Sequence, residues 1–199
     1  MTSRRVDVLA RDAVFDGYFR VDRYQLTHEL HAGGTSASLS REVFERGHVS
    51  ALLPVDPIAD KVVLIEQFRP GALAAGWDAW LLECVAGIIE DGEQAEGVAV
   101  RECHEETGLL VHDCKLISRY LTSPGACSET VHLYAGRVDA TTAGGVFGLA
   151  AEGEDIKVLS VDIDEALELL QGGRIVNSKT IIALQWLALQ RNNLQKIWS

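Results

Sequence analysis

The sequence predicts an α/β fold that is preceded by a small all-β module. Short runs of β-branched and aliphatic residues, separated by turn residues, fill most of the first half of the chain, and helical patterns enter later. The chain has 199 residues, of which 47% are hydrophobic and 24% charged, so it can bury a core without disulfides or structural metals. We expect the β module to cover residues 1–50 and the main domain to cover 51–199.

The N-terminal module is predicted to contain a hairpin, because residues 5–50 have extended character throughout. β-forming residues at 20–30 and at 37–45 flank the sequence His-Ala-Gly-Gly at 31–34, which supplies turn residues. The module therefore adds strands in front of the main domain.

The main domain is predicted to mix strands with three helices. Strands are expected at 50–55, 61–68, 81–85, 114–121, 130–138 and 156–161. The helix expected at 95–107 ends at Gly108, a residue that tolerates the left-handed backbone of a helix C-terminus. Further helices are expected at 164–171 and 178–194. Residues 141–154 are rich in Gly and Ala, and we expect them to form a long, mobile and functional loop.

Composition excludes several classes of partner. The formal net charge is -11 and no basic stripe is present, which argues against nucleic-acid binding. No apolar run is long enough to span a bilayer, and no signal peptide is expected. The four cysteines lack zinc-like or CxxC spacing, so we interpret them as reduced thiols of a cytoplasmic protein. An acidic protein can still bind a small anion through a cation or a few arginines.

Three glutamates are predicted to share one face of the helix at 95–107. Glu102, Glu105 and Glu106 stand at positions i, i+3 and i+4, which places their carboxylates side by side. Like charges at this spacing repel by about a few tenths of a kcal/mol per pair. Hard oxygen ligands at this density suit magnesium. The alternative is a solvated charged face, which is common for a glutamate-rich run.

A longer pattern around these glutamates decides between the two interpretations. Residues 87–109 read GIIEDGEQAEGVAVRECHEETGL, so that Gly87, five residues, Glu93 and seven residues precede Arg-Glu-x-x-Glu-Glu-x-Gly-Leu. This segment resembles the Nudix box at every fixed position, and a chance match has odds of roughly one in a million. The preceding ECVAG at 83–87 resembles the family's E-x-P-A-G, with Val85 in place of proline. We expect that departure to change the stiffness of the loop rather than metal ligation.

The resemblance implies a Nudix hydrolase with a divalent metal site. Its implied ligands are a backbone oxygen and three carboxylates, at Ala86, Glu102, Glu105 and Glu106. Two or three Mg²⁺ ions are implied as cofactors, with Mn²⁺ as the alternative. Arg101 would orient the carboxylates and balance their charge, and Glu93 would brace the segment from outside the ligand set.

Features outside the box resemble the bacterial ADP-ribose pyrophosphatases of this family. Pro124 lies fifteen residues beyond Leu109, at the position that marks this subfamily. The resemblance implies hydrolysis of ADP-ribose to AMP and ribose 5-phosphate, with Glu152 as general base and Glu154 as the competing candidate. It also implies substrate contacts from Tyr18, Arg41, Arg69, Gly125 and Glu129.

Two alternatives stay open at this stage. The chain could be a pyrophosphatase for another nucleoside-diphosphate sugar such as GDP-mannose, because Nudix enzymes share chemistry and differ in substrate. It could also be a non-catalytic nucleotide-sugar binding module or regulator built on a Nudix scaffold, although its box glutamates are intact. A P-loop phosphohydrolase is excluded, because Glu93 stands where that motif requires lysine.

The resemblance also implies a particular architecture. The Nudix fold is an α/β/α sandwich, a mixed sheet with helices on both faces. The N-terminal strands would form a separate small antiparallel sheet. In this subfamily those strands typically exchange between two subunits, so we expect a homodimer in which Tyr18 and Arg41 act at the partner's site.

Overall fold

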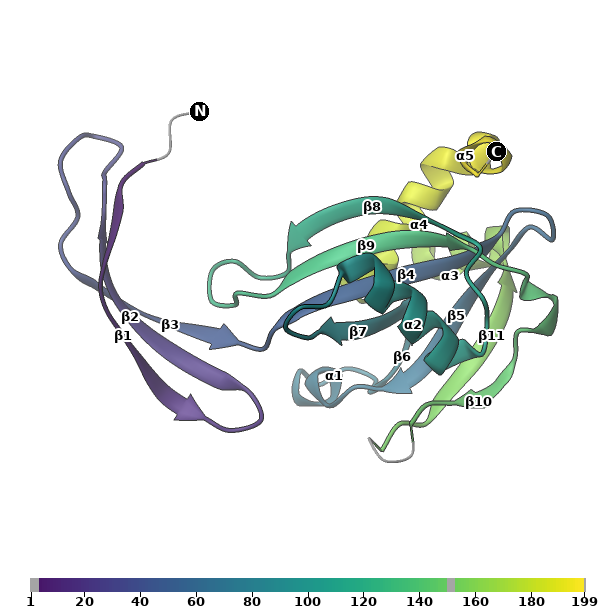
Figure 1. Cartoon of the computed structure of the whole chain (residues 1–199), viewed down its shortest axis with the longest axis horizontal. Helices are drawn as coiled ribbons and strands as arrows, with labels where there is room; N and C mark the ends of the chain where they lie inside the picture. The colour runs from purple at the N-terminus through teal and green to yellow at the C-terminus, as the bar shows by residue number, and fades with distance from the viewer. Residues whose placement is uncertain (1–3, 150–152, 199) are drawn as a thin grey trace. The chain divides into compact units, whose positions relative to one another are not determined.

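The computed structural model describes residues 4–149 and 153–198 and divides the chain into two compact units. The N-terminal unit contains the chain up to His48 together with Leu121–Thr130. The larger unit contains Val49–Tyr120 and the chain from Val131 onward. The segment Leu121–Thr130 therefore groups with the N-terminal strands, although it lies far from them in the sequence. Figure 1 labels the elements of both units.

The N-terminal unit is built on a three-stranded antiparallel sheet in the order β1-β2-β3. Its strands are β1 (Val6–Asp16), β2 (Arg20–His28) and β3 (Leu39–Glu45). Asp22 is 1% exposed, and it accepts hydrogen bonds from Arg11 (2.6 Å) and Arg20 (2.7 Å). These arginines hold the pKa of Asp22 below its usual value even though burial acts to raise it. A buried carboxylate with two cationic partners fixes the pairing of β1 and β2.

The larger unit is a mixed eight-stranded sheet with helices. Its strands are β4 (His48–Asp56), β5 (Lys61–Phe68), β6 (Trp80–Glu83), β7 (Val85–Ile89), β8 (Asp113–Leu121), β9 (Thr130–Arg137), β10 (Gly145–Phe147) and β11 (Ile156–Asp162). Its helices are α1 (Pro70–Ala74), α2 (Ala95–Thr107), α3 (Ile163–Gln171), α4 (Ser178–Gln190) and α5 (Leu194–Ile197). Short 3₁₀ turns lie at Ala140–Thr142 and Arg191–Asn193. β4 and β9 are parallel, whereas β4 and β5 are antiparallel.

The two faces of this sheet carry separate hydrophobic cores. Along β5, Val62 and Leu64 pack with residues of α3 and α4, whereas Val63 and Ile65 pack with residues of α2. Alternate side chains of a strand point to opposite faces, so the buried centre of β5 supports both layers of helices. The predicted α/β/α sandwich and the separate small antiparallel sheet are confirmed.

Strands β4 and β5 separate along most of their length, and β7, which contributes to the candidate site, pairs with β4 there. β4 and β5 pair only at Val55↔Val62 and Asp56↔Lys61. Beyond that point β6 pairs with β5 and β7 pairs with β4. The single strand predicted at 81–85 is thus wrong, because the chain changes partner at Cys84 and continues as a second strand. A strand pattern in the sequence does not reveal which neighbour each half of the run will choose.

The Gly-rich segment is more ordered than the sequence suggests. Asp139 accepts a hydrogen bond from the Thr141 N–H (2.9 Å) at the start of a 3₁₀ turn, and β10 then pairs with β11. The Phe147 ring lies against Gly108, whose φ of 72° closes α2. The mobile loop predicted across 141–154 is therefore wrong for its first half. Its central residues, 150–152, lie outside the described part of the chain.

Two further features concern the class of protein. No helix within the described residues is both long and apolar enough to cross a membrane. The four cysteines are free thiols, and Cys84 and Cys103 are buried. Burial raises the pKa of the Cys103 thiol to about 12, so this side chain packs as a neutral group in the core beneath α2.

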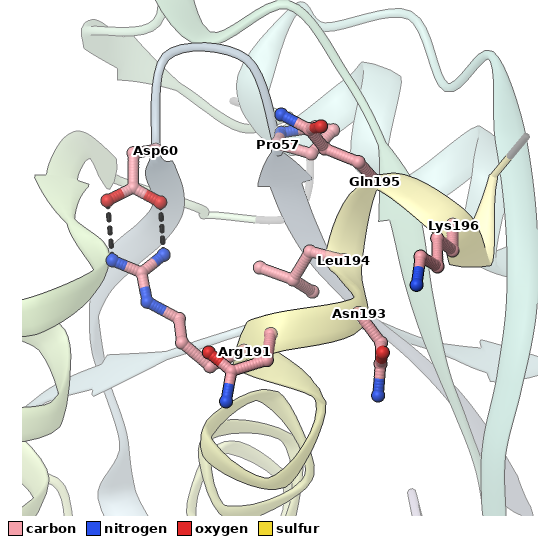
Figure 2. Close-up of a pocket in the computed structure, with 8 residues that line it drawn as sticks. Pro57, Asp60, Arg191, Asn193, Leu194, Gln195 and Lys196 are labelled. Atoms are coloured by element: carbon pink, nitrogen blue, oxygen red, sulfur yellow. Dashed lines mark hydrogen bonds and ion pairs between the residues drawn. The ribbon is translucent and has the colours of Figure 1, made fainter.

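A pocket of about 220 Å³ opens beside the C-terminal helix α5 (Figure 2). Its lining includes Pro57, Asp60, Arg191, Leu194 and Gln195. Both guanidinium NH₂ groups of Arg191 bond the two carboxylate oxygens of Asp60 (Figure 2). This ion pair ties the β4–β5 turn to the end of α4, so we assign the charged wall of the pocket to folding.

We expect Asp60→Asn to make the free energy of unfolding less dependent on pH in the acidic range. The Arg191 guanidinium holds the pKa of Asp60 below its usual value. Stability from the pair is therefore fully present above the unfolded pKa of about 4 and is lost as pH falls through the lower folded value. Urea unfolding at pH 7 should show a loss of about 1 kcal/mol or less, because the pair is partly exposed. The difference from wild type should shrink and vanish as the pH falls through the folded pKa of Asp60, which lies below its usual value, and a constant difference would contradict the assignment.

Candidate active site

Helix α2 presents the predicted glutamates at different depths. The helix runs from Ala95 to Thr107, and the N–H of its C-terminal cap Gly108 donates to the His104 carbonyl (2.8 Å). This agrees with the predicted helix at both ends. Glu106 is 3% exposed, whereas the Glu102 and Glu105 side chains are 15% and 32% exposed. The carboxylates on this face of α2 are therefore increasingly buried in the order Glu105, Glu102 and Glu106.

Glu106 is a buried carboxylate beside β7. The Ala86 N–H donates a hydrogen bond to Glu106 Oε2 at 3.1 Å. Burial raises the pKa of Glu106 to about 8, and the charges of Glu102 and Glu154 add to this effect. The bond from Ala86 and the charge of Arg69 oppose it only in part. The raised pKa means that the surrounding protein does not balance a negative charge on Glu106.

Glu102 lies directly against Gly87, the first residue of the box. A Cβ atom at Gly87 would collide with the Glu102 carboxylate, so only glycine leaves room for this side chain. Burial raises the pKa of Glu102, the charge of Arg101 opposes the shift, and the charges of Glu105 and Glu154 add to it. The box glycine is therefore needed for the Glu102 carboxylate to lie against β7 in this position.

Arg101 lies at the outer edge of the glutamate cluster. It contacts Glu105 at 2.8 Å, Glu102 at 2.9 Å and Glu93 at 3.6 Å. Glu93 also accepts a hydrogen bond from the Glu90 N–H (2.9 Å), which closes the turn before α2. The structure brings together the residues to which the sequence assigned orienting and bracing roles.

The donor set fits a hard divalent cation. Carboxylate and carbonyl oxygens are the ligands that Mg²⁺ takes, usually together with water and substrate phosphates. Among residues 4–149 and 153–198, no three His, Cys, Asp or Glu side chains form a ready-made metal cage. Arg101 instead bonds Glu102 and Glu105. The uncompensated Glu106 carboxylate and the adjacent backbone of Ala86 are the observations that favour a cation here.

Arg69 has a partner that the sequence did not indicate. Its Nε donates to Glu83 Oε2 at 2.5 Å, and Lys179 of α4 lies 3.9 Å from the same carboxylate. Glu83 is 2% exposed, so two cations surround one buried charge. The only available signal was the place of Glu83 at the head of the ECVAG segment. Arg69 is therefore held by β6 and keeps its other nitrogen atoms for further contacts.

Of the two candidate bases, the structure describes one. Glu154 accepts a hydrogen bond from the Leu149 N–H at 3.0 Å. Its charge contributes to the raised pKa of both Glu102 and Glu106. Glu152 lies outside the described residues. Glu154 thus acts electrostatically on the glutamate cluster.

The remaining predicted substrate contacts lie in the N-terminal unit. Tyr18 is 88% exposed, and Arg41 of β3 is exposed and bonds the Ser40 carbonyl (2.8 Å). Gly125 lies in the connection between β8 and β9. Glu129 is buried and pairs with Arg46 at 2.8 Å. Sequence reasoning missed Arg46, because nothing in the local pattern distinguishes it from a surface arginine.

Comparison with known proteins points to one family. The NUDIX domain model matches residues 46–184. A relative from Escherichia coli (strain K12), named ADP-ribose pyrophosphatase, is 46% identical over 194 residues, which cover 98% of this chain and 93% of the relative. One of the same name from Haemophilus influenzae is 40% identical over 97% of this chain and 90% of its own length. A GDP-mannose pyrophosphatase from Cronobacter sakazakii is 34% identical over 94% of this chain and 97% of its own length.

A solved structure supports the fold independently of close sequence identity. The crystal structure of an ADP compounds hydrolase superposes with a TM-score of 0.73 at 18% identity, covering 100% of this chain and 98% of the other. The resemblance inferred from the box is confirmed by a family match whose range includes α2 and the strands of the large sheet. The chain belongs to the Nudix family.

Proposed function

We propose that this protein hydrolyses the diphosphate of ADP-ribose to AMP and ribose 5-phosphate. The observation that carries the proposal is the buried Glu106 beside Ala86 and Glu102, within an intact Nudix box. Relatives of 40% and 46% identity named ADP-ribose pyrophosphatase support this substrate. The relative named GDP-mannose pyrophosphatase is less similar, at 34% identity.

The cofactors we propose are two or three Mg²⁺ ions, with Mn²⁺ as a substitute. The Ala86 carbonyl and the carboxylates of Glu102, Glu105 and Glu106 would hold them. When bound, such ions neutralise the diphosphate and lower the pKa of water at the site. Arg101 would then keep its contact with Glu93 while the carboxylates turn toward the metal.

The chain's own groups supply the remaining chemistry. We assign Glu152 as the base that takes a proton from the attacking water, with Glu154 as the competing residue. Arg69 is anchored through Nε, so its terminal nitrogens would bind a phosphate oxygen. Tyr18, Arg41, Gly125 and Glu129 would bind the rest of the nucleotide. Displacement at one phosphorus breaks the P–O–P bridge, and each product leaves with one phosphate.

A substrate panel tests the proposal. Products from ADP-ribose, GDP-mannose, ADP-glucose and a nucleoside triphosphate would be measured with Mg²⁺ and with chelator. We expect Mg²⁺-dependent AMP from ADP-ribose at a higher kcat/KM than for the other compounds. Preference for GDP-mannose would overturn the assignment of ADP-ribose as substrate but would leave the proposed Mg²⁺-dependent hydrolysis of a diphosphate in place. The absence of product from all four compounds would favour the non-catalytic binding-module alternative.

The choice of base can be tested by exchanging each candidate for its amide. We expect Glu152→Gln to lower kcat for ADP-ribose by about 10² to 10⁴, the usual contribution of a general base, with little change in KM. Glu154→Gln should have a smaller effect, because it removes only an electrostatic neighbour of Glu102 and Glu106. The reverse order in single-turnover measurements would transfer the role to Glu154.

We also propose that the N-terminal sheet mediates a homodimer, with strands exchanged between subunits. Several apolar side chains of this unit are 41–88% exposed, namely Val6, Val8, Leu9, Val14, Phe15 and Tyr18. A three-stranded sheet with such faces gains stability by covering them. Sedimentation velocity should give a dimer, and a monomer at all concentrations would contradict this. The cytoplasmic location stays a prediction.

A further inference from the structure

A buried polar network joins the start of α4 to the junction of β6 and β7. The Cys84 N–H donates to Thr180 Oγ1 at 2.8 Å, and that hydroxyl donates to Asn177 Oδ1 at 2.6 Å. The Asn177 side-chain amide donates to the Leu82 carbonyl at 2.7 Å. Thr180 is 0% exposed and Cys84 is 0% exposed, so bulk water does not compete for these bonds. Four groups therefore satisfy one another within the core.

The side chains of Asn177 and Thr180 make the hydrogen bonds to Leu82 and Cys84 that a neighbouring strand would otherwise make. Leu82 and Cys84 are two residues apart, so their backbone groups lie on the same side of the extended chain. Glu83 between them pairs with Ile65 of β5. Asn177 also accepts the Thr180 N–H (3.1 Å) as the N-cap of α4. The Asn177 side chain thus caps α4 and also bonds the junction of β6 and β7, and these two contacts fix its position.

The junction lies next to the proposed metal site. Two residues after Cys84, the Ala86 N–H donates to Glu106, and Ala86 supplies the proposed carbonyl ligand. A trans peptide chain has two soft torsions per residue, so fixing Cys84 limits where the Ala86 peptide can lie. Removing the anchor would let β7 shift relative to α2 by a fraction of an ångström, which is enough to loosen a small cation that demands regular geometry.

We propose that Thr180 and Asn177 are positioning residues for the metal site. They fix the Ala86 peptide relative to Glu106 through Cys84 and Leu82. This inference rests on the proposed function, because it assigns these residues a role in binding the cation used there. Neither residue touches the cation, and each acts through the backbone that carries a ligand.

Thr180→Val tests the role with almost no change of shape, because it replaces only the hydroxyl with a methyl group. Mn²⁺ affinity would be measured by electron paramagnetic resonance without substrate, and kcat and KM for ADP-ribose would be measured across Mn²⁺ concentrations. We expect the dissociation constant for Mn²⁺ to rise about tenfold, the lower end of the range for groups that orient metal ligands. At saturating Mn²⁺, the KM for ADP-ribose should stay near wild type.

Two controls separate positioning from general loss of stability. Thr180→Ser keeps the hydroxyl and should restore wild-type Mn²⁺ affinity. Leu187→Ala, on the same buried face of α4, removes core packing without touching the network. It should lower the melting temperature while leaving Mn²⁺ affinity unchanged. Should Thr180→Val not fold, Asn177→Asp keeps the acceptor for Thr180 and loses the donor to Leu82, and the same rise is expected.

The outcomes distinguish this inference from the proposed function. Wild-type Mn²⁺ affinity in folded Thr180→Val overturns the positioning role while leaving the function untouched. Equal losses in Thr180→Val and Leu187→Ala overturn it as well, because they would reflect stability alone. A wild-type protein that binds no Mn²⁺ overturns the proposed function and this assignment together.

Discussion

Glu106→Gln is expected to lower kcat for ADP-ribose by about 10³ while leaving the fold intact. The amide keeps the shape and can still accept the Ala86 N–H, but it loses the negative charge of a proposed metal ligand. Metal-ion catalysis contributes several kcal/mol of charge stabilisation, and each 1.36 kcal/mol corresponds to about a factor of ten in rate. Steady-state assays with saturating Mg²⁺ would measure the loss, and circular dichroism would check the fold.

Glu106→Gln should not destabilise the protein when a chelator has removed divalent cations. The carboxylate of Glu106 is 3% exposed, and burial penalises its charged form. The neutral amide avoids that penalty, so the melting temperature should equal or exceed that of wild type. Glu96→Gln, an exposed position in the first turn of α2, is the matched control and should change neither property. Wild-type turnover in Glu106→Gln would refute the metal assignment.

Gly87→Ala is expected to lower kcat/KM by about 10², because its new Cβ would take the place of the Glu102 carboxylate. The backbone at Gly87 has no left-handed φ, so alanine meets no backbone strain there. The colliding atoms are the far end of a flexible side chain, which can swing away. We therefore expect activity and metal affinity to fall much more than stability. Calorimetry of metal binding and thermal melts would separate the two.

Gly97→Ala is the matched control for Gly87→Ala. A Cβ at Gly97, in the first turn of α2, meets no atom within 4 Å. Alanine restricts the unfolded chain and favours the helix, so stability should rise by about 0.5–1 kcal/mol with unchanged turnover. Equal losses of activity in the two variants would mean that α2 as a whole, rather than the contact between Gly87 and Glu102, responds to substitution.

Much of the fold and part of the site follow from local sequence. The helix at Ala95–Thr107 and its end at Gly108 agree with the prediction, because helical periodicity and a C-terminal glycine act over neighbouring residues. The spacing of Glu102, Glu105 and Glu106 likewise required only the geometry of one helix. The division of the run 81–85 into two strands did not follow, because hydrophobicity does not specify which strand a residue pairs with.

The sequence alone determined the family, the order of most elements and the glutamates that share a face of α2. Only the tertiary structure decided that Glu106 is buried, that Arg69 is held by Glu83, and that Thr180 bonds Cys84 across 96 residues. The physical reason is range. Helix periodicity and caps depend on residues within a turn or two, whereas burial and ion pairing depend on which distant segments pack together.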